Sequence, residues 1–214
     1  MAATHTSGSA LGNYLVLYNT LSALLRGLII ARTVHLWGAL GTPAVWGELH
    51  VLARWAETIT AVEVIHAAAG LVRAAPATAA LQVAGRNTIV WAITRNYPDV
   101  AAREWAYPCM LIVWNAADIL RYTYYVVDGG SGQAPRFLSW LRYNMFIVLY
   151  PVGILSEMWL VHQVIQPSKA RSSTYQYLLW LGLLIYVPAF YILYGHMLSQ
   201  RSKAGRKPAK PKGL

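Results

Sequence analysis

The sequence has few cysteines and few charges, and each shortage excludes a class of protein. Cys109 is the only cysteine among 214 residues, which excludes an internal disulfide and a zinc site built from several thiolates. Charged residues make up 12% of the chain, about half the fraction typical of soluble domains. No two histidines are spaced i,i+4, and no Walker or dinucleotide glycine pattern occurs. These shortages predict a membrane protein without a metal site.

The chain is basic overall, but the positive charge is concentrated at one end. The net charge is +10, and six of the 18 basic residues lie in the last fourteen positions: Arg201, Lys203, Arg206, Lys207, Lys210 and Lys212. A basic tail on an apolar body is typical of contact with an anionic cytosolic leaflet or of an address signal, and it disfavours nucleic acid as a partner. We therefore expect a membrane domain over residues 1–198 and a disordered, basic cytosolic tail over 199–214.

Long apolar runs fill most of the remaining chain. Six of them approach the roughly 20 residues that a helix needs to cross a bilayer, and they cover residues 14–38, 52–72, 78–95, 105–127, 137–164 and 175–198. Barrel strands would alternate over about ten residues, whereas these runs are longer and uniformly apolar. The sequence therefore predicts an all-α membrane protein, a bundle of six transmembrane helices.

Basic residues between the predicted spans indicate the orientation of the chain. With six spans, the N-terminus, the loops that contain Arg73 and Arg136, and the tail share one side, which carries eight basic residues. The other side carries four: Arg95, Arg103, Lys169 and Arg171. Because the more basic side faces the cytosol, we expect both termini there, although without the tail the bias would reverse.

Charged residues occur inside five of the six predicted spans, where each costs about 2.5–3.5 kcal/mol on insertion scales. Such residues should face the protein interior and pair with one another. We interpret four of them, toward span ends or in less apolar surroundings, as structural ion pairs that lock the bundle: Arg26, Arg32, Arg54 and Glu57.

Tyr150 and Glu157 in the fifth span form a different pattern. Their spacing of seven residues is about two helical turns, so the two side chains share a face with about 10.5 Å of rise between them. Pro151 lies between them and removes one backbone donor, so we expect a kink there. A phenol and a carboxyl on one face can act as an acid–base pair. The spacing alone also allows a structural hydrogen bond.

The predicted topology orders the charged residues by depth. Arg142, Asp118 and Arg121 lie near the cytosolic ends of their spans, and Tyr150 and Glu157 lie deeper. Two arginines at this mouth would hold an anion such as a phosphate above the acid–base pair. The arrangement suits an amphiphile with a phosphorylated head and a long apolar tail.

Four segments lie in order in the second to fifth predicted spans: "AVEVIHAAAGLVR", "LQVAGRNTIVW", "WNAADILRYTYY" and "WLRYNMFIVLYPVGILSE". They resemble the motifs of the very-long-chain 3-hydroxyacyl-CoA dehydratases, the endoplasmic-reticulum enzymes of fatty-acid elongation that are also called protein tyrosine phosphatase-like. The similarity covers about residues 14–198.

This resemblance implies removal of water from a 3-hydroxyacyl-CoA to give a trans-2-enoyl-CoA, without organic cofactor or metal, in a bundle that encloses an acyl-chain cavity. It implies catalysis by Tyr150, which we expect to take the C2 proton, and Glu157, which we expect to protonate the departing hydroxyl; the reverse is chemically allowed. Supporting positions fall on Glu63, Gln82, Arg86, Arg142, Gly153 and Ser156, to which we add Arg121 and Asp118. The implied partners are membrane lipid and the other elongation-cycle membrane enzymes, namely the condensing enzyme and the reductases.

The chain departs from the family pattern at two positions. Asp118 stands where relatives usually have Glu, which keeps the charge and shortens the reach. His66 is followed by Ala67 where some relatives have Cys, so the thiol that phosphotyrosine hydrolysis requires is missing.

Two further interpretations concern the location and the function of the protein. The ending "KPKGL" resembles the dilysine retrieval signal of the endoplasmic reticulum, and a generic basic tail on anionic lipid is the alternative. A transporter or channel with a charge-lined path, or a catalytically silent scaffold of the elongation complex, are the alternative functions. Transporters often show inverted repeats and broken spans, and here one span contains a central proline and no repeat is evident.

Overall fold

The computed structural model describes residues 10–72, 74–131 and 134–205, and this part of the chain is almost entirely helical. Its elements, in chain order, are α1 (Ala10–Leu40), α2 (Thr42–Ile59), α3 (Ala61–Ala68), α4 (Pro76–Thr88), the π-helix η1 (Ile89–Thr94), α5 (Pro98–Arg103), α6 (Ala106–Ser131), α7 (Arg136–Lys169) and α8 (Ser173–Gly205). No strand occurs in the described ranges, which confirms the predicted all-α class.

Each predicted apolar segment coincides with helix, although two of them are interrupted. The segment 52–72 covers the end of α2 and all of α3, and it breaks at Thr60, whose hydroxyl donates to the carbonyl of Glu57. The segment 78–95 begins in α4 and continues as the π-helix η1. π-Helical stretches are rare in proteins, and those that occur often lie near functional sites. The apolar pattern predicts neither interruption, because it does not report a local change in backbone hydrogen bonding.

Local sequence accounts for several helix ends. Prolines occupy the first turn of three helices, where the missing N–H has no intrahelical acceptor: Pro43, Pro76 and Pro98. α3 ends in a Schellman motif, in which the Leu71 N–H donates to the His66 carbonyl at 2.9 Å and the Gly70 N–H donates to the Ala67 carbonyl at 3.1 Å. Gly70 has a φ of 70°, which glycine adopts without strain.

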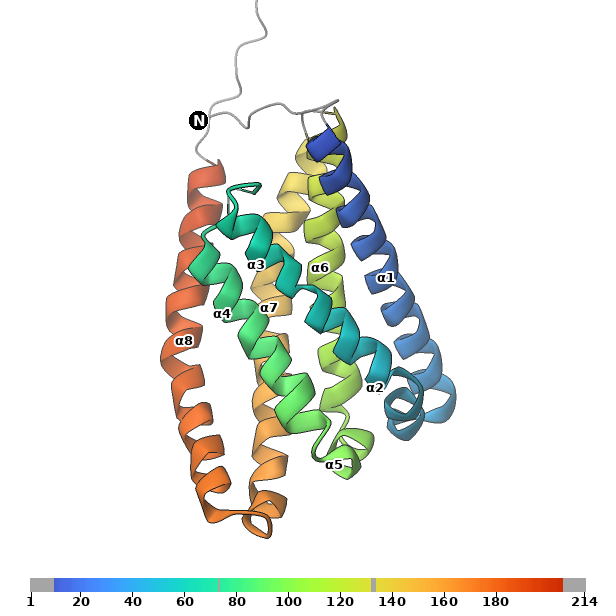
Figure 1. Ribbon diagram of the computed structural model, residues 1–214, viewed down its shortest axis with the longest axis vertical. Helices are drawn as coiled ribbons and strands as arrows, with labels where there is room; N and C mark the ends of the chain where they lie inside the picture. The colour runs from blue at the N-terminus through green and yellow to red at the C-terminus, as the bar shows by residue number, and fades with distance from the viewer. Residues whose placement is uncertain (1–9, 73, 132–133, 206–214) are drawn as a thin grey trace, which may run out of the picture.

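The long helices run up and down in a bundle (Figure 1). α1 packs along α6, α6 along α7, and α7 along α8, while α2, α3 and α4 cross in front of α6 and α7 in this view. α1 begins at the end of the bundle where α8 ends, as an even number of passes requires. Among the described elements, the backbone of α8 lies against α7 only. At the start of α8, the Tyr175 phenol donates to the carbonyl of Ala92 in η1 at 2.8 Å.

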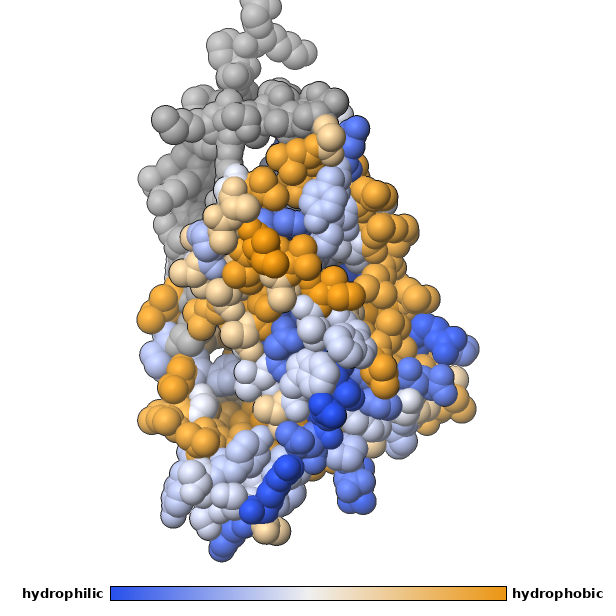
Figure 2. Space-filling model, viewed as in Figure 1, coloured by the Kyte–Doolittle hydropathy of each residue, from blue (hydrophilic) through white to orange (hydrophobic). Residues whose placement is uncertain are grey.

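Within the described residues, three helices are long and apolar enough to cross a membrane: α1, α7 and the Ser173–Ile192 part of α8. Their outer faces carry large apolar side chains, and five leucines of α1 are each more than half exposed: Leu17, Leu21, Leu24, Leu28 and Leu40. Figure 2 shows apolar side chains gathered along the α1 edge of the molecule. An apolar outer surface of this extent is typical of lipid contact. A bundle of six membrane-crossing helices stays a prediction.

The end of α8 differs from the prediction for the tail. α8 continues to Gly205, so residues 199–205, which we expected to be disordered, are helical: the helix runs on for about two further turns through the polar segment "SQRSKAG", which contains no proline. Residues 206–214, with Lys210 and Lys212 of the expected retrieval signal, lie outside the described residues, as does Arg73.

Candidate active site

The carboxyl of Glu157 is held between two neighbouring helices. The indole Nε1 of Trp114 on α6 donates to Oε1 of Glu157 at 2.7 Å, and the phenol of Tyr186 on α8 donates to Oε2 at 2.8 Å. Each carboxyl oxygen therefore has its own donor, and three helices, α6, α7 and α8, meet at this one side chain. A charged or polar group buried among apolar helices is expected to have such partners.

Tyr150 lies two turns before Glu157 on α7 and also faces α8. Its ring stacks on Phe190 and Tyr194, with ring centroids 5.7 Å and 6.1 Å apart. Its phenol oxygen is buried and has no hydrogen-bond partner among the described residues. A buried hydroxyl without a partner costs about 1–3 kcal/mol, so its presence calls for an explanation. The two residues thus present their side chains to the same neighbouring helix, as their spacing predicts.

Gly153 and Ser156 shape the contact between α6 and α7 beside this carboxyl. A Cβ on Gly153 would lie 3.5 Å from Val113 and 3.6 Å from the indole of Trp114, so a larger side chain would press on the group that holds Glu157. Ser156 is buried, and its hydroxyl donates to the carbonyl of Val152 at 2.8 Å, within its own helix.

Substitutions of Gly153 test whether the position of the Trp114 indole matters. Gly153→Ala should change stability little, because its Cβ makes ordinary van der Waals contacts, whereas Gly153→Leu should destabilise by about 1–3 kcal/mol through overpacking. Thermal unfolding of the detergent-solubilised protein measures both. Gly182→Leu on α8 is the matched control, since no heavy atom lies within 4 Å of a Cβ there. Equal losses for the two leucine variants would contradict the prediction.

A cluster of charged side chains in the interior of the bundle balances its own charge. This charge network consists of three arginines and three acids: Arg26, Arg86, Arg121, Glu57, Glu63 and Asp118. Asp118 lies 2.6 Å from Arg86 and 3.2 Å from Arg121. It also lies 3.4 Å from Arg26. Each of the six contacts an opposite charge, which is the condition for keeping charged groups away from water.

The network runs from the middle of α1 to α3. Arg26 is only 2% exposed and pairs with Glu57 on α2. At the other end, Arg121 pairs with Glu63 on α3 at 2.9 Å, and the phenol of Tyr122 also donates to Glu63. Five helices, α1, α2, α3, α4 and α6, are therefore joined by charge pairs, in line with the interpretation of Arg26 and Glu57 as a structural pair.

Trp114 connects the charge network to Glu157. The guanidinium of Arg86 lies 4.8 Å from the centroid of the Trp114 ring, and its Nη2 donates to the Trp114 carbonyl at 3.2 Å. The N–H of the same indole donates to Glu157. A rigid aromatic side chain thus couples the position of Arg86 to that of the carboxyl.

Other residues expected at the site lie apart from Glu157. Gln82 is exposed on α4. Arg142 lies over the rings of Tyr124 and Tyr125, at 4.3 Å and 4.7 Å, and donates to the Tyr125 phenol at 3.1 Å. Arg121, which we expected beside Arg142 as an anion clamp, is instead engaged in the charge network, because two acids reach it there.

Two further charged residues expected in ion pairs lie outside the network. Arg32 pairs with Glu48 at 3.6 Å, and both side chains are more than half exposed. Arg54 lies 5.1 Å from the centroid of the Trp91 ring, a cation–π contact.

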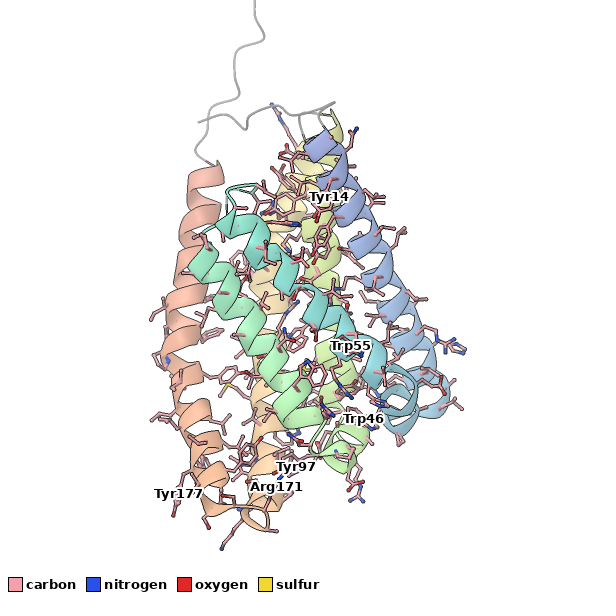
Figure 3. The ribbon with its side chains drawn as sticks, viewed as in Figure 1. Tyr14, Trp46, Trp55, Tyr97, Arg171 and Tyr177 are labelled. Atoms are coloured by element: carbon pink, nitrogen blue, oxygen red, sulfur yellow. The ribbon has the colours of Figure 1, made fainter. Side chains whose placement is uncertain are left out.

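The expected acyl-chain cavity is not confirmed. Of the hollows that the described residues outline, one is a groove of about 580 Å³ between α1 and α6, lined by residues such as Ala23 and Gly27. Another, of about 200 Å³, lies near the start of α8 between Asn96, Arg171 and Tyr175, at the end of the bundle where Figure 3 labels Arg171. Neither of these two includes Tyr150 or Glu157.

Sequence reasoning missed Trp114 and Tyr186. A signal existed for Trp114, which precedes Asp118 by four residues and Arg121 by seven and so shares their helix face. Tyr186 lies in the predicted span that has no charged residue before its last turns. A tyrosine there reads as an ordinary apolar or anchoring residue.

Several known proteins are similar to this sequence over most of its length. Residues 57–207 match the family described as protein tyrosine phosphatase-like protein, PTPLA. A Schizosaccharomyces pombe protein named probable very-long-chain (3R)-3-hydroxyacyl-CoA dehydratase is 39% identical over 92% of this chain and 94% of that protein. The very-long-chain (3R)-3-hydroxyacyl-CoA dehydratase of Caenorhabditis elegans is 31% identical over 89% and 93%, and dehydratase 1 of Canis lupus familiaris is 32% identical over 69% and 64%. No solved structure matches the chain.

Proposed function

Because the chain belongs to the protein tyrosine phosphatase-like family, PTPLA, we propose that it removes water from very-long-chain (3R)-3-hydroxyacyl-CoA and releases trans-2-enoyl-CoA. Relatives named very-long-chain (3R)-3-hydroxyacyl-CoA dehydratase match most of the chain. The observation in the structure that carries the proposal is the buried phenol of Tyr150, without a hydrogen-bond partner among the described residues, on the helix face that also presents Glu157.

The elimination needs one group that takes the C2 proton and another that protonates the C3 hydroxyl. In our assignment the Tyr150 phenolate takes the C2 proton, the freed electron pair forms the C2–C3 double bond, and the C3–O bond breaks. The oxygen leaves as water with the proton of Glu157. One proton then passes from Tyr150 to Glu157, directly or through water, and resets the pair. The reverse assignment uses the same two groups.

The charged residues take supporting roles in this proposal. Arg86 steadies Trp114 and, through it, the orientation of Glu157. Asp118, Arg121 and Glu63 hold Arg86 and the surrounding helices in register through the charge network. Arg142 lies two turns before Tyr150 on α7, and we assign it to the phosphates of coenzyme A, because a guanidinium binds phosphate oxygens in pairs.

We further propose that the protein crosses the endoplasmic-reticulum membrane six times with both termini in the cytosol, beside the other elongation-cycle enzymes. Three helices of suitable length and apolarity support a membrane location. The position of the start of α1 and the end of α8 at one end of the bundle supports an even number of crossings (Figure 1).

The direct test is an assay of the purified, detergent-solubilised protein with 3-hydroxyacyl-CoAs of several chain lengths. We expect formation of trans-2-enoyl-CoA, with the preferred chain length read from the same series. A wild-type protein that dehydrates none of them would refute the proposal. Solute flux in proteoliposomes in that case would favour a transporter.

A further inference from the structure

One face of α8 touches both members of the proposed acid–base pair. Three aromatic residues recur every fourth position on this face, and we call them the α8 aromatic stripe: Tyr186, Phe190 and Tyr194. Tyr186 contacts the carboxyl of Glu157, while Phe190 and Tyr194 stack on the ring of Tyr150 and on each other. The helix whose predicted span, residues 175–198, has no Asp, Glu, Lys or Arg therefore contributes to the immediate surroundings of both groups.

The two partners of Glu157 differ in what they can do with a proton. An indole N–H only donates, so the oxygen that faces Trp114, Oε1, must accept in every protonation state. A phenol both donates and accepts, so the contact between Tyr186 and Oε2 is compatible with a carboxylate and with a carboxylic acid. The proton of the neutral carboxyl therefore belongs on Oε2.

We propose that Tyr186 is a positioning residue for the dehydration, an inference that rests on the proposed function. It orients the Glu157 carboxyl against Trp114 and keeps the transferable proton on Oε2. In the carboxylic acid, the O–H of Glu157 donates to the phenol oxygen. When that proton leaves with the substrate hydroxyl as water, the phenol O–H turns and donates to Oε2. Each oxygen of the carboxylate therefore has a hydrogen-bond donor as soon as the carboxylate forms.

The consequence for the reaction is a lower barrier at the proton-transfer step. Hydrogen bonds to charged groups are about twice as strong as bonds between neutral groups, and they gain strength where water is absent. The Tyr186 contact is therefore stronger in the carboxylate that forms during the reaction than in the starting acid. Only an interaction that strengthens on the way to the transition state raises kcat.

Tyr186→Phe tests the inference, because it removes one oxygen and keeps the ring. We expect kcat to fall by about 10- to 100-fold, the equivalent of one hydrogen bond to a charged group, with KM nearly unchanged. We also expect the infrared C=O band of the Glu157 carboxylic acid, identified by its absence in Glu157→Gln, to move. A role for Tyr186 that does not involve the Glu157 carboxyl would not move that band, and a contact that only stabilises the fold would not lower kcat.

Tyr191→Phe on the same helix is the matched control, since its ring is 73% exposed and it should keep wild-type values. Trp114→Phe is a second variant that removes the other donor, with Trp159→Phe as its control, because Trp159 donates to Glu104 at 2.7 Å near the surface. Tyr186→Phe with wild-type kcat, or with lower kcat and an unmoved band, overturns the inference. An inactive wild type refutes the proposed function instead, and the band still decides whether Tyr186 binds Glu157.

Discussion

Glu157→Gln and Tyr150→Phe each lower dehydratase turnover by about 10²- to 10⁴-fold, the contribution of a positioned acid or base. In Glu157→Gln, the amide oxygen accepts from Trp114 and the amide NH₂ donates to Tyr186, so the shape and both contacts survive while the transferable proton is lost. In Tyr150→Phe, the ring keeps its stack on Phe190 and only the hydroxyl disappears. Rates of trans-2-enoyl-CoA formation per folded protein measure both losses.

Stability separates a functional hydroxyl at Tyr150 from a structural one. Because that oxygen is buried without a partner among the described residues, Tyr150→Phe should leave the free energy of unfolding unchanged or raise it, by up to about 1–3 kcal/mol. A structural hydrogen bond predicts the opposite sign. Glu104→Gln is the matched control for Glu157→Gln, because Glu104 also accepts an indole N–H. Tyr177→Phe is the matched control for Tyr150→Phe, because Tyr177 is 72% exposed. Wild-type turnover in both catalytic-site variants would show that the site is assigned wrongly.

Glu57→Gln lowers the free energy of unfolding by about 3–5 kcal/mol, the usual effect of removing one partner from a buried ion pair. Glu57 is 1% exposed, and its carboxylate pairs with Arg26 and, at 3.3 Å, with Arg86. Without it, the charge network holds three arginines against two acids, and Arg26, which is 2% exposed, loses one of its two carboxylate partners. The midpoint of thermal or denaturant unfolding in detergent measures the loss.

A surface pair and a compensating variant make this prediction specific. Glu48→Gln removes a carboxylate that is 60% exposed and 3.6 Å from Arg32, so we expect a change of at most about 1 kcal/mol. Adding Arg26→Met to Glu57→Gln restores charge balance and should recover part of the lost stability. If Glu57→Gln is no more harmful than Glu48→Gln, the network does not stabilise the bundle.

The sequence predicts where the helices lie but not the local irregularities within them. The helical segments can be predicted because lipid allows few other backbone structures and the apolar runs are long. The break at Thr60 and the π-helix that begins at Ile89 are not readable, since a hydroxyl that bonds to a nearby carbonyl, or an extra residue in a turn, leaves the apolar pattern intact.

The candidate site shows the same division. Spacing along one helix indicates that Tyr150 and Glu157 share a face, because the helical period is fixed. It does not indicate what the neighbouring helices bring to that face: Trp114 lies 43 residues before Glu157, and Tyr186 lies 29 residues after it. Arg121 is likewise predicted to lie at the mouth of the site, and only the tertiary arrangement, in which side chains of α6 and α3 meet, brings it to Glu63.

The position of Tyr186 on the last helix has a consequence for biogenesis. While a ribosome is still making the chain, the helices through α7 can enter the bilayer and bring Trp114 to Glu157, but the phenol contact waits for α8. The acid therefore acquires its second donor only after synthesis of the whole helical body. A polypeptide released prematurely would insert its earlier helices yet lack the contact from Tyr186, so we expect incomplete products to be inactive.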